Sequence, residues 1–102
     1  MQSQELAKKM KSGEAPCVLD VRSGTEFRAG HIPGAVHAPS WKILLRIAAL
    51  PKEKDAPVVV TCEQGPRAML AKSLLDGRGY GNVELLDGHM AGWRRAGLPL
   101  ER

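Results

Sequence analysis

Residues 58–67 read Val58-Val59-Val60-Thr61-Cys62-Glu63-Gln64-Gly65-Pro66-Arg67. The first four residues are all β-branched, which favours a buried β-strand. Residues 68–76 follow as an amphipathic helix ended by Gly77 and Gly79, with apolar side chains at Met69, Leu70, Leu74 and Leu75. The stretch therefore predicts a strand, a short loop and a helix.

The rest of the chain repeats this alternation of short apolar runs and helical stretches. Further strands are predicted at residues 17–21, 35–38 and 83–86. Helices are predicted from Ser3 to Gly13, from a Ser23/Glu26 capping box to Gly30, and at residues 41–50 and 90–95. In the 41–50 helix, Trp41, Leu44, Leu45 and Ala48 would share the apolar face. Strands separated by helices need crossover connections, so we predict one α/β domain over residues 1–102, with a parallel sheet and helices on both faces.

Composition excludes several classes of protein. The chain has 102 residues, of which 43% are hydrophobic and 25% charged, as expected for one folded domain and not for a disordered segment. Its longest apolar stretch, residues 43–50, is interrupted by Arg46 and is far shorter than the ~18 residues of a membrane span. No signal peptide is visible in the first residues, so we expect a cytoplasmic protein whose two cysteines are free thiols.

The positive charge of the chain is modest and dispersed. The formal net charge is +4, and no run of the 15 Lys and Arg residues is longer than two. Two Trp, one Tyr and one Phe are too few to form a stacking platform for single strands. We therefore expect no nucleic-acid partner, and a surface that attracts small anions accounts for the charge.

Cys62 is the candidate nucleophile. Ligands bind at the carboxyl ends of parallel strands, and the strand at residues 58–61 delivers Cys62 to that edge. The start of a helix stabilises a thiolate, Gly65 lets backbone N–H groups turn inward as an anion nest, and Arg67 adds a fixed cation. The alternative from spacing alone is a buried structural cysteine beside a turn, and both readings stay open on this evidence.

The chain resembles the rhodanese homology domain, a sulfurtransferase fold, over nearly its whole length. Three motifs carry the resemblance in the family's order: Leu19-Asp20-Val21-Arg22 with Glu26-Phe27, Gly30-His31-Ile32-Pro33-Gly34-Ala35 and Pro39; then Cys62, Gly65 and Arg67 as C-x-x-G-x-R; then Leu86-Asp87-Gly88 with Trp93 and Gly97-Leu98-Pro99. Two residues depart from the pattern, because His89 replaces a usual second glycine and His37 a common asparagine. The resemblance implies a sheet of about five parallel strands, although the usual leading strand is not evident in Met1 to Gln4.

The resemblance also implies an activity. Cys62 would accept a sulfane sulfur from thiosulfate or a low-molecular-weight persulfide and pass it to cyanide or a thiol, with no metal or organic cofactor. A second hypothesis is a sulfur relay module that exchanges persulfide sulfur with a partner protein. A phosphatase or arsenate reductase is less favoured, because such relatives carry one more residue between cysteine and arginine than the four found here. A regulatory domain is disfavoured because such members commonly lack the cysteine.

The remaining residues receive narrower expectations. Glu63, Gln64, Gly65, Pro66 and Arg67 are the predicted substrate-binding residues, with Glu63 and Gln64 flanking the entrance and setting selectivity. Asp20 and Arg22 would either support the Cys62 loop or, as we favour, form an ion pair with Glu26 or the chain near Gly30. We expect His31 to bond to backbone, His89 to have no chemical role, and Trp41 and Trp93 to lie in the core or the cleft wall. Cys17 would be buried and inert, with a resolving thiol as the alternative.

Overall fold

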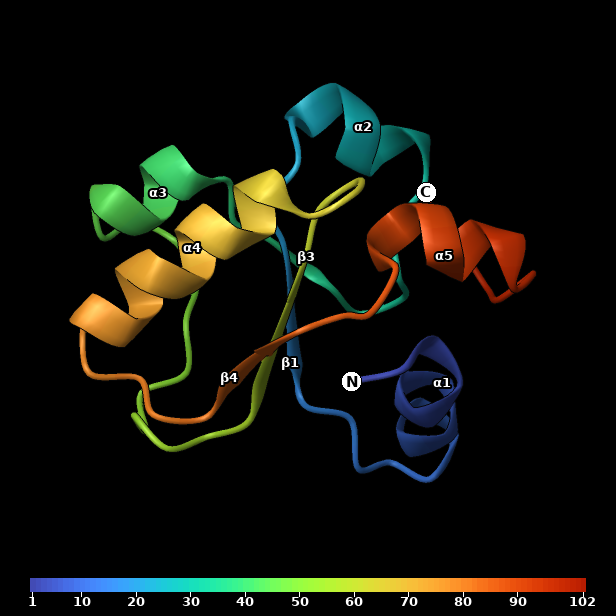
Figure 1. The fold of residues 1–102 in the computed structure, drawn as a ribbon, viewed down its shortest axis with the longest axis horizontal. Helices are drawn as coiled ribbons and strands as arrows, with labels where there is room; N and C mark the ends of the chain where they lie inside the picture. Colours follow the sequence, from blue (N-terminus) through green and yellow to red (C-terminus); the bar gives the residue numbers. More distant parts are fainter.

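A computed structural model describes residues 1–102, and its helices and strands alternate along the chain (Figure 1). In order they are α1 (Ser3–Lys11), β1 (Cys17–Asp20), α2 (Gly24–Ala29), β2 (Val36–His37), α3 (Ser40–Leu44), β3 (Val58–Thr61), α4 (Pro66–Gly77), β4 (Val83–Leu85) and α5 (His89–Arg95). The α/β class predicted from the sequence is therefore confirmed. None of these helices is both long and apolar enough to cross a membrane.

The strands form one parallel sheet in the order β2-β1-β3-β4. The sheet has four strands, so the expectation of about five was wrong. Where a leading strand would lie, only Met1 adds to the sheet edge: its amino group donates to the Leu85 carbonyl at 2.9 Å, and its own carbonyl accepts from the Asp87 amide at 2.8 Å. The helix α1 begins at Ser3.

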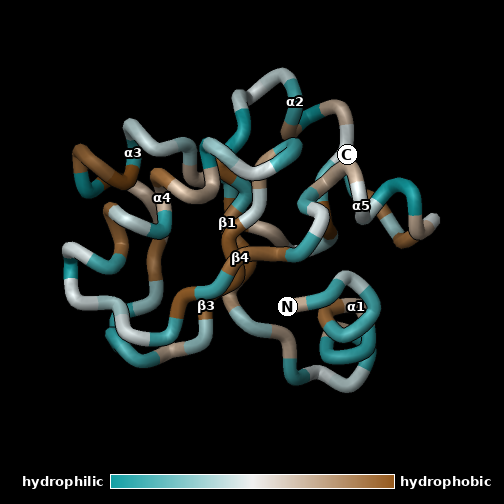
Figure 2. Tube along the Cα trace, viewed as in Figure 1, coloured by the Kyte–Doolittle hydropathy of each residue, from teal (hydrophilic) through white to brown (hydrophobic).

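Each face of the sheet has its own apolar core, because successive side chains of a strand point to opposite faces. Val58 and Val60 pack with Ala71 and other residues of α3 and α4, whereas Val59 packs with residues of α1 and α5. Figure 1 shows these helix pairs on opposite sides of the strands, and Figure 2 shows the hydrophobic strands at the centre. The strand β3 is buried along its whole length and fixes the position of the residue that follows it.

The predicted helix at 41–50 is much shorter than expected. The helix α3 ends at Leu44, and Arg46 takes a left-handed conformation with φ of 61° that turns the chain. Ile43 is the buried residue of α3, whereas Trp41, predicted to be in the core or the cleft wall, is 55% exposed. After the turn, Ala48 packs against the same core as Ile43. The turn therefore brings Ala48 to the core, where a continuous helix was expected to place it.

The predicted apolar face of the helix after the loop was also partly wrong. The helix α4 buries Ala68, Ala71 and Leu75, which lie three and four residues apart on one face. Met69 and Leu70, expected to be apolar core residues, are exposed. The buried face of the helix thus combines two small alanine side chains with Leu75, and the sizes of the apolar side chains in this segment do not distinguish it from the exposed face.

Candidate active site

The loop that joins β3 to α4, residues 62–67, is called the Cys62 loop below. It lies at the carboxyl ends of the strands, beside the start of α5 and near α2 (Figure 1). The first two residues of the loop are fixed by α5: the Met90 amide donates to the Cys62 carbonyl at 3.0 Å, and the Ala91 amide to the Glu63 carbonyl at 3.2 Å. Amides in the first turn of a helix have no partner within the helix, so these bonds satisfy α5 as well as holding the loop.

The Cys62 side chain is turned into the loop and is only 1% exposed. The Gly65 amide donates a hydrogen bond to Cys62 Sγ at 3.0 Å. Gly65 has φ of 143°, in a region that glycine adopts easily and other residues do not, and it directly precedes Pro66 at the start of α4. The sulfur thus receives a backbone N–H at a helix N-terminus, an arrangement that favours a negative charge on sulfur.

Arg67 is paired with a carboxylate from α2. Its Nη1 and Nη2 donate to the two carboxylate oxygens of Glu26 at 2.6 and 3.1 Å, and Glu26 also closes the predicted capping box with Ser23. The hydrogen bond with Arg67 is the main reason that the pKa of Glu26 falls to about 2. The pKa of Arg67 is raised, first by the hydrogen bond to Glu26 and also by the charge of Cys62.

Arg22 is buried beside the loop and has several partners. It donates from Nε and Nη2 to the buried carboxylate of Asp20, and from Nη2 to the Gly30 carbonyl at 2.8 Å. Of the two structural partners expected for Arg22, the chain near Gly30 is found, whereas Glu26 binds Arg67 instead. Nη1 of Arg22 also lies 3.6 Å from the Glu63 carboxylate, which links this pair to the Cys62 loop.

Glu63 lies between two guanidinium groups. Besides Arg22, Arg94 of α5 forms an ion pair with it, and sequence reasoning missed this partner because nothing in the chain order connects the two residues. The acidic charge in the loop is therefore compensated. Gln64 is exposed.

His89, which we expected to have no chemical role, contacts the loop directly. The Cys62 amide donates to His89 Nδ1 at 3.3 Å, and the ring is so close to Gly65 that a Cβ atom there would lie 3.4 Å from Nε2. The only signal of this contact in the sequence was that His89 replaces a glycine that is usual in the family. Burial lowers the pKa of His89, with the charge of Asp87 acting in the opposite direction.

Other residues lie apart from the loop. His31 Nδ1 is 2.8 Å from the Phe27 carbonyl oxygen, the backbone bond expected for it, and Trp93 is fully buried. Cys17 is half-buried at the start of β1, and burial raises its pKa.

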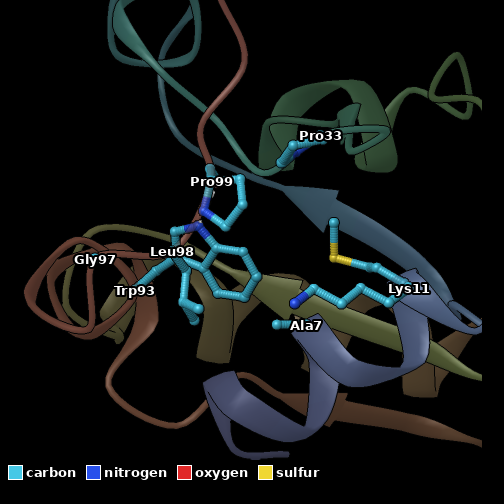
Figure 3. Close-up of a pocket in the computed structure, with 8 residues that line it drawn as sticks. Ala7, Lys11, Pro33, Trp93, Gly97, Leu98 and Pro99 are labelled. Atoms are coloured by element: carbon cyan, nitrogen blue, oxygen red, sulfur yellow. Dashed lines mark hydrogen bonds between the residues drawn. The ribbon is translucent and has the colours of Figure 1, made fainter.

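A cavity of about 410 Å³ is lined by α1 and the segment after α5, with Lys11, Trp93 and Leu98 among its walls, and no residue of the Cys62 loop lines it (Figure 3). No group of three or more His, Cys, Asp or Glu side chains is placed to hold a metal ion.

The geometry and the motifs agree with a comparison to known families. The family model of the rhodanese-like domain matches residues 2–96. The chain belongs to the rhodanese-like domain family. The resemblance inferred from the sequence motifs is therefore confirmed.

Similar proteins place this rhodanese-like domain among sulfurtransferases. A sulfurtransferase of Allochromatium vinosum is 35% identical over 98 residues, which are 96% of this chain and 90% of that protein. The thiosulfate sulfurtransferase GlpE of Pseudomonas putida is 35% identical over 92 residues, 88% of this chain and 80% of that protein. The crystal structure of the Alr3790 protein from Anabaena has a TM-score of 0.88 at 30% identity, covering 99% of this chain and 81% of that one. At the family level, these relatives support a sulfurtransferase.

Proposed function

We propose that this rhodanese-like domain is a sulfurtransferase that carries sulfur as a persulfide on Cys62. The donor is thiosulfate or a low-molecular-weight persulfide, and the acceptor is cyanide or a thiol. The observation that carries the proposal is the hydrogen bond from the Gly65 amide to Cys62 Sγ, 3.0 Å long, in a loop that ends at a helix N-terminus. A thiolate and a persulfide anion need the same stabilisation, so one loop serves both states.

The reaction proceeds in two displacements. The Cys62 thiolate attacks the outer sulfur of thiosulfate, the S–S bond of thiosulfate breaks, and sulfite leaves with the electron pair. A low-molecular-weight persulfide leaves as its thiolate in the same way. The Cys62 persulfide is then attacked at its outer sulfur by cyanide or a thiolate, which forms thiocyanate or a new persulfide and returns the Cys62 thiolate. No net oxidation or reduction occurs, and no metal or organic cofactor takes part.

The surroundings of the loop support an anionic donor. A cavity of about 320 Å³ has Arg22, Glu26, Arg94 and Arg102 among the residues that line it, and two of these, Arg22 and Arg94, also contact Glu63 of the loop. Because Glu63 already contacts Arg22 and Arg94, it does not present an uncompensated negative charge to the donor. In this proposal Glu63 and Gln64 set donor selectivity, Gly65 and Pro66 hold the loop backbone, and Arg67 adds positive charge. Asp20 and Arg22 keep the loop in place.

The relay module is the second candidate, and one observation favours it. Large apolar side chains on α3, on the turn after it and on α4 are exposed, namely Trp41, Leu44, Leu45, Ile47, Met69 and Leu70. Hydrophobic residues around α3 are visible in Figure 2, and α4 begins at the Cys62 loop. Exposed apolar residues near the loop would suit a protein that delivers or accepts persulfide sulfur.

Activity of two cysteine variants tests the proposal. Cys62→Ser should abolish formation of thiocyanate from thiosulfate and cyanide, because serine cannot hold the transferred sulfur. Cys17→Ser is the matched control and should keep most of the activity. Cys17 begins β1 and pairs with Val58 at the start of β3, whereas Cys62 follows the other end of β3. A Cys62→Ser protein that forms thiocyanate at the parent rate would show that the nucleophile is assigned wrongly.

A further inference from the structure

His89 lies where two features of the Cys62 loop meet. Its Nδ1 accepts the amide hydrogen of Cys62 at 3.3 Å, and its ring faces Gly65, whose own amide donates to Cys62 Sγ. The side chain is buried, with 7% of the residue exposed. One ring therefore contacts both the nucleophile's backbone and the residue that supplies a donor to the sulfur.

The backbone at His89 is in a conformation that histidine does not favour. Its φ is 51°, in the left-handed region, directly after Gly88 with φ of 76°. A glycine would adopt this conformation at no cost, and an asparagine would adopt it more easily than most residues. Strain of this kind persists where contacts of the side chain compensate for it, and here the contacts are those to Cys62 and Gly65.

The hydrogen bond defines the state of the imidazole ring. Because Nδ1 accepts from an amide, the proton of the neutral ring is on Nε2, and a protonated ring would place an N–H against the Cys62 N–H. Cys62 from the loop and Asp87 from its own segment are titratable groups that act on or contact His89. Asp87 is itself 3.8 Å from the amino group of Met1.

We propose that His89 is a positioning residue for sulfur transfer, whose neutral ring fixes the Cys62 amide and packs against Gly65 so that the loop keeps its hydrogen bond to the sulfur. The proposal rests on the function assigned to Cys62 and adds a residue to it. Protonation of His89 removes the acceptor for the Cys62 amide and loosens the loop. Transfer therefore falls when His89 becomes charged.

The sign of the pH dependence follows from burial of the ring. Burial lowers the pKa of His89 from its ordinary value of 6.5, so the ring is neutral at pH 8. The midpoint of the proposed loss of transfer therefore lies below pH 6.5, in addition to any loss from protonation of the Cys62 thiolate. The two contributions separate in a variant that keeps an acceptor at position 89 but cannot titrate.

Three variants make that separation. His89→Asn keeps an oxygen acceptor near the position of Nδ1, tolerates positive φ and has no titration. His89→Gly relieves the backbone but removes both contacts. His31→Asn is the matched control, because His31 is also buried but its ring contacts the Phe27 carbonyl and not the Cys62 amide. Sulfur loading from thiosulfate and iodoacetamide alkylation of Cys62 are measured from pH 5 to pH 8.5, together with the ring ¹⁵N chemical shifts of His89 in the wild-type protein.

The expected results are specific to each variant. His89→Gly loads sulfur about tenfold more slowly at pH 8, the loss expected when a buried donor has no partner, whereas His89→Asn stays within about threefold of wild type. His89→Asn also lacks part of the decline below pH 6.5 that the wild type and His31→Asn share. The ¹⁵N shifts report an unprotonated Nδ1 at pH 8, and the Cys62 amide resonance moves as His89 titrates.

Three results would overturn the proposal: an Nδ1 that carries the proton at pH 8, a His89→Gly variant within twofold of wild type at pH 8, or equal declines in His89→Asn and wild type. The ring shifts and the alkylation rates do not depend on sulfur transfer. A protein that fails as a sulfurtransferase would therefore still decide whether His89 holds the Cys62 amide.

Discussion

Charged side chains around Cys62 occur in pairs. Arg67 binds Glu26, Arg22 binds Asp20, and Arg94 binds Glu63. Each carboxylate fixes the position of a guanidinium group. Positive charge is therefore available to a donor at defined points, although the net positive charge around the loop stays small. Removing one partner would leave the other free to move or to repel a donor.

Arg67 offers the clearest test of this charge arrangement. Arg67→Ala removes the cation of the loop, and we expect kcat/KM for thiosulfate to fall about tenfold while the fold is retained, because the side chain is 45% exposed. Alkylation of Cys62 at a fixed pH should also become slower. Lys72→Ala is the control, since it removes one positive charge from the same helix at an ion pair with Asp76. An Arg67→Ala protein with an unchanged alkylation profile would remove this arginine from the mechanism.

The Glu26–Arg67 pair also has a defined pH range. With a folded pKa of about 2 against 4.5 for the ordinary group, Glu26 stabilises the fold fully above pH 4.5 and loses that contribution as the pH falls toward 2. The pair is therefore intact throughout the range in which His89 is proposed to titrate. A decline in transfer between pH 8 and pH 5 is not a sign that this pair breaks.

At the scale of elements, β3, the Cys62 loop and α4 act as one unit. Four residues separate Cys62 from Arg67, and the amide of Gly65 already reaches the sulfur. Inserting one glycine after Gly65 would widen the ring of amides while leaving thiol, arginine and helix dipole in place. We expect sulfurtransferase activity to fall at least tenfold and phosphatase activity to become detectable with p-nitrophenyl phosphate.

The wild-type loop should show no such hydrolysis. Turnover of p-nitrophenyl phosphate by the unmodified protein equal to that of Cys62→Ser is the expected result, because the shorter loop has no room for three phosphate oxygens. Robust turnover that depends on Cys62 would contradict the argument from loop size and favour a phosphatase.

The sequence was sufficient to predict elements whose pattern is local. The β-branched run of β3, the Ser23 capping box and the three family motifs each identified their structure or family. It was insufficient for α3 and α4, where burial is decided by the shape of the neighbouring surface: Ile43 and Ala71 face the sheet while larger apolar residues stay exposed. The contacts of Arg94 and His89 with the loop depend on how α5 docks, and no local pattern encodes that.

At the scale of the whole molecule, two apolar cores share one sheet. Leu6 of α1 is fully buried in the core between the sheet and the helices α1 and α5. Leu75 of α4 is buried in the core between the sheet and the helices α3 and α4. Leu6→Ala and Leu75→Ala should each lower the free energy of unfolding by about 2–5 kcal/mol. Because β3 contributes to both cores, each variant should unfold in a single transition, with far-UV and near-UV circular dichroism coincident in urea.

Exposed leucines provide the control for these variants. Leu44→Ala, in a residue that is 67% exposed, should change the free energy of unfolding by less than about 1 kcal/mol. Two separate transitions in either core variant would mean that the faces of the sheet unfold independently and that the chain is not one cooperative unit.

The intact mass of the protein shows whether Cys62 carries the transferred sulfur. Wild type and Cys17→Ser, incubated with thiosulfate or glutathione persulfide and freed of donor, should each gain the mass of one sulfur atom with at least one donor. Cyanide should remove that mass, and Cys62→Ser should not gain it. Loading by the persulfide alone would identify the donor class within the same account. A sulfur atom gained by Cys62→Ser, or no gain by the wild type with either donor, would contradict the claim.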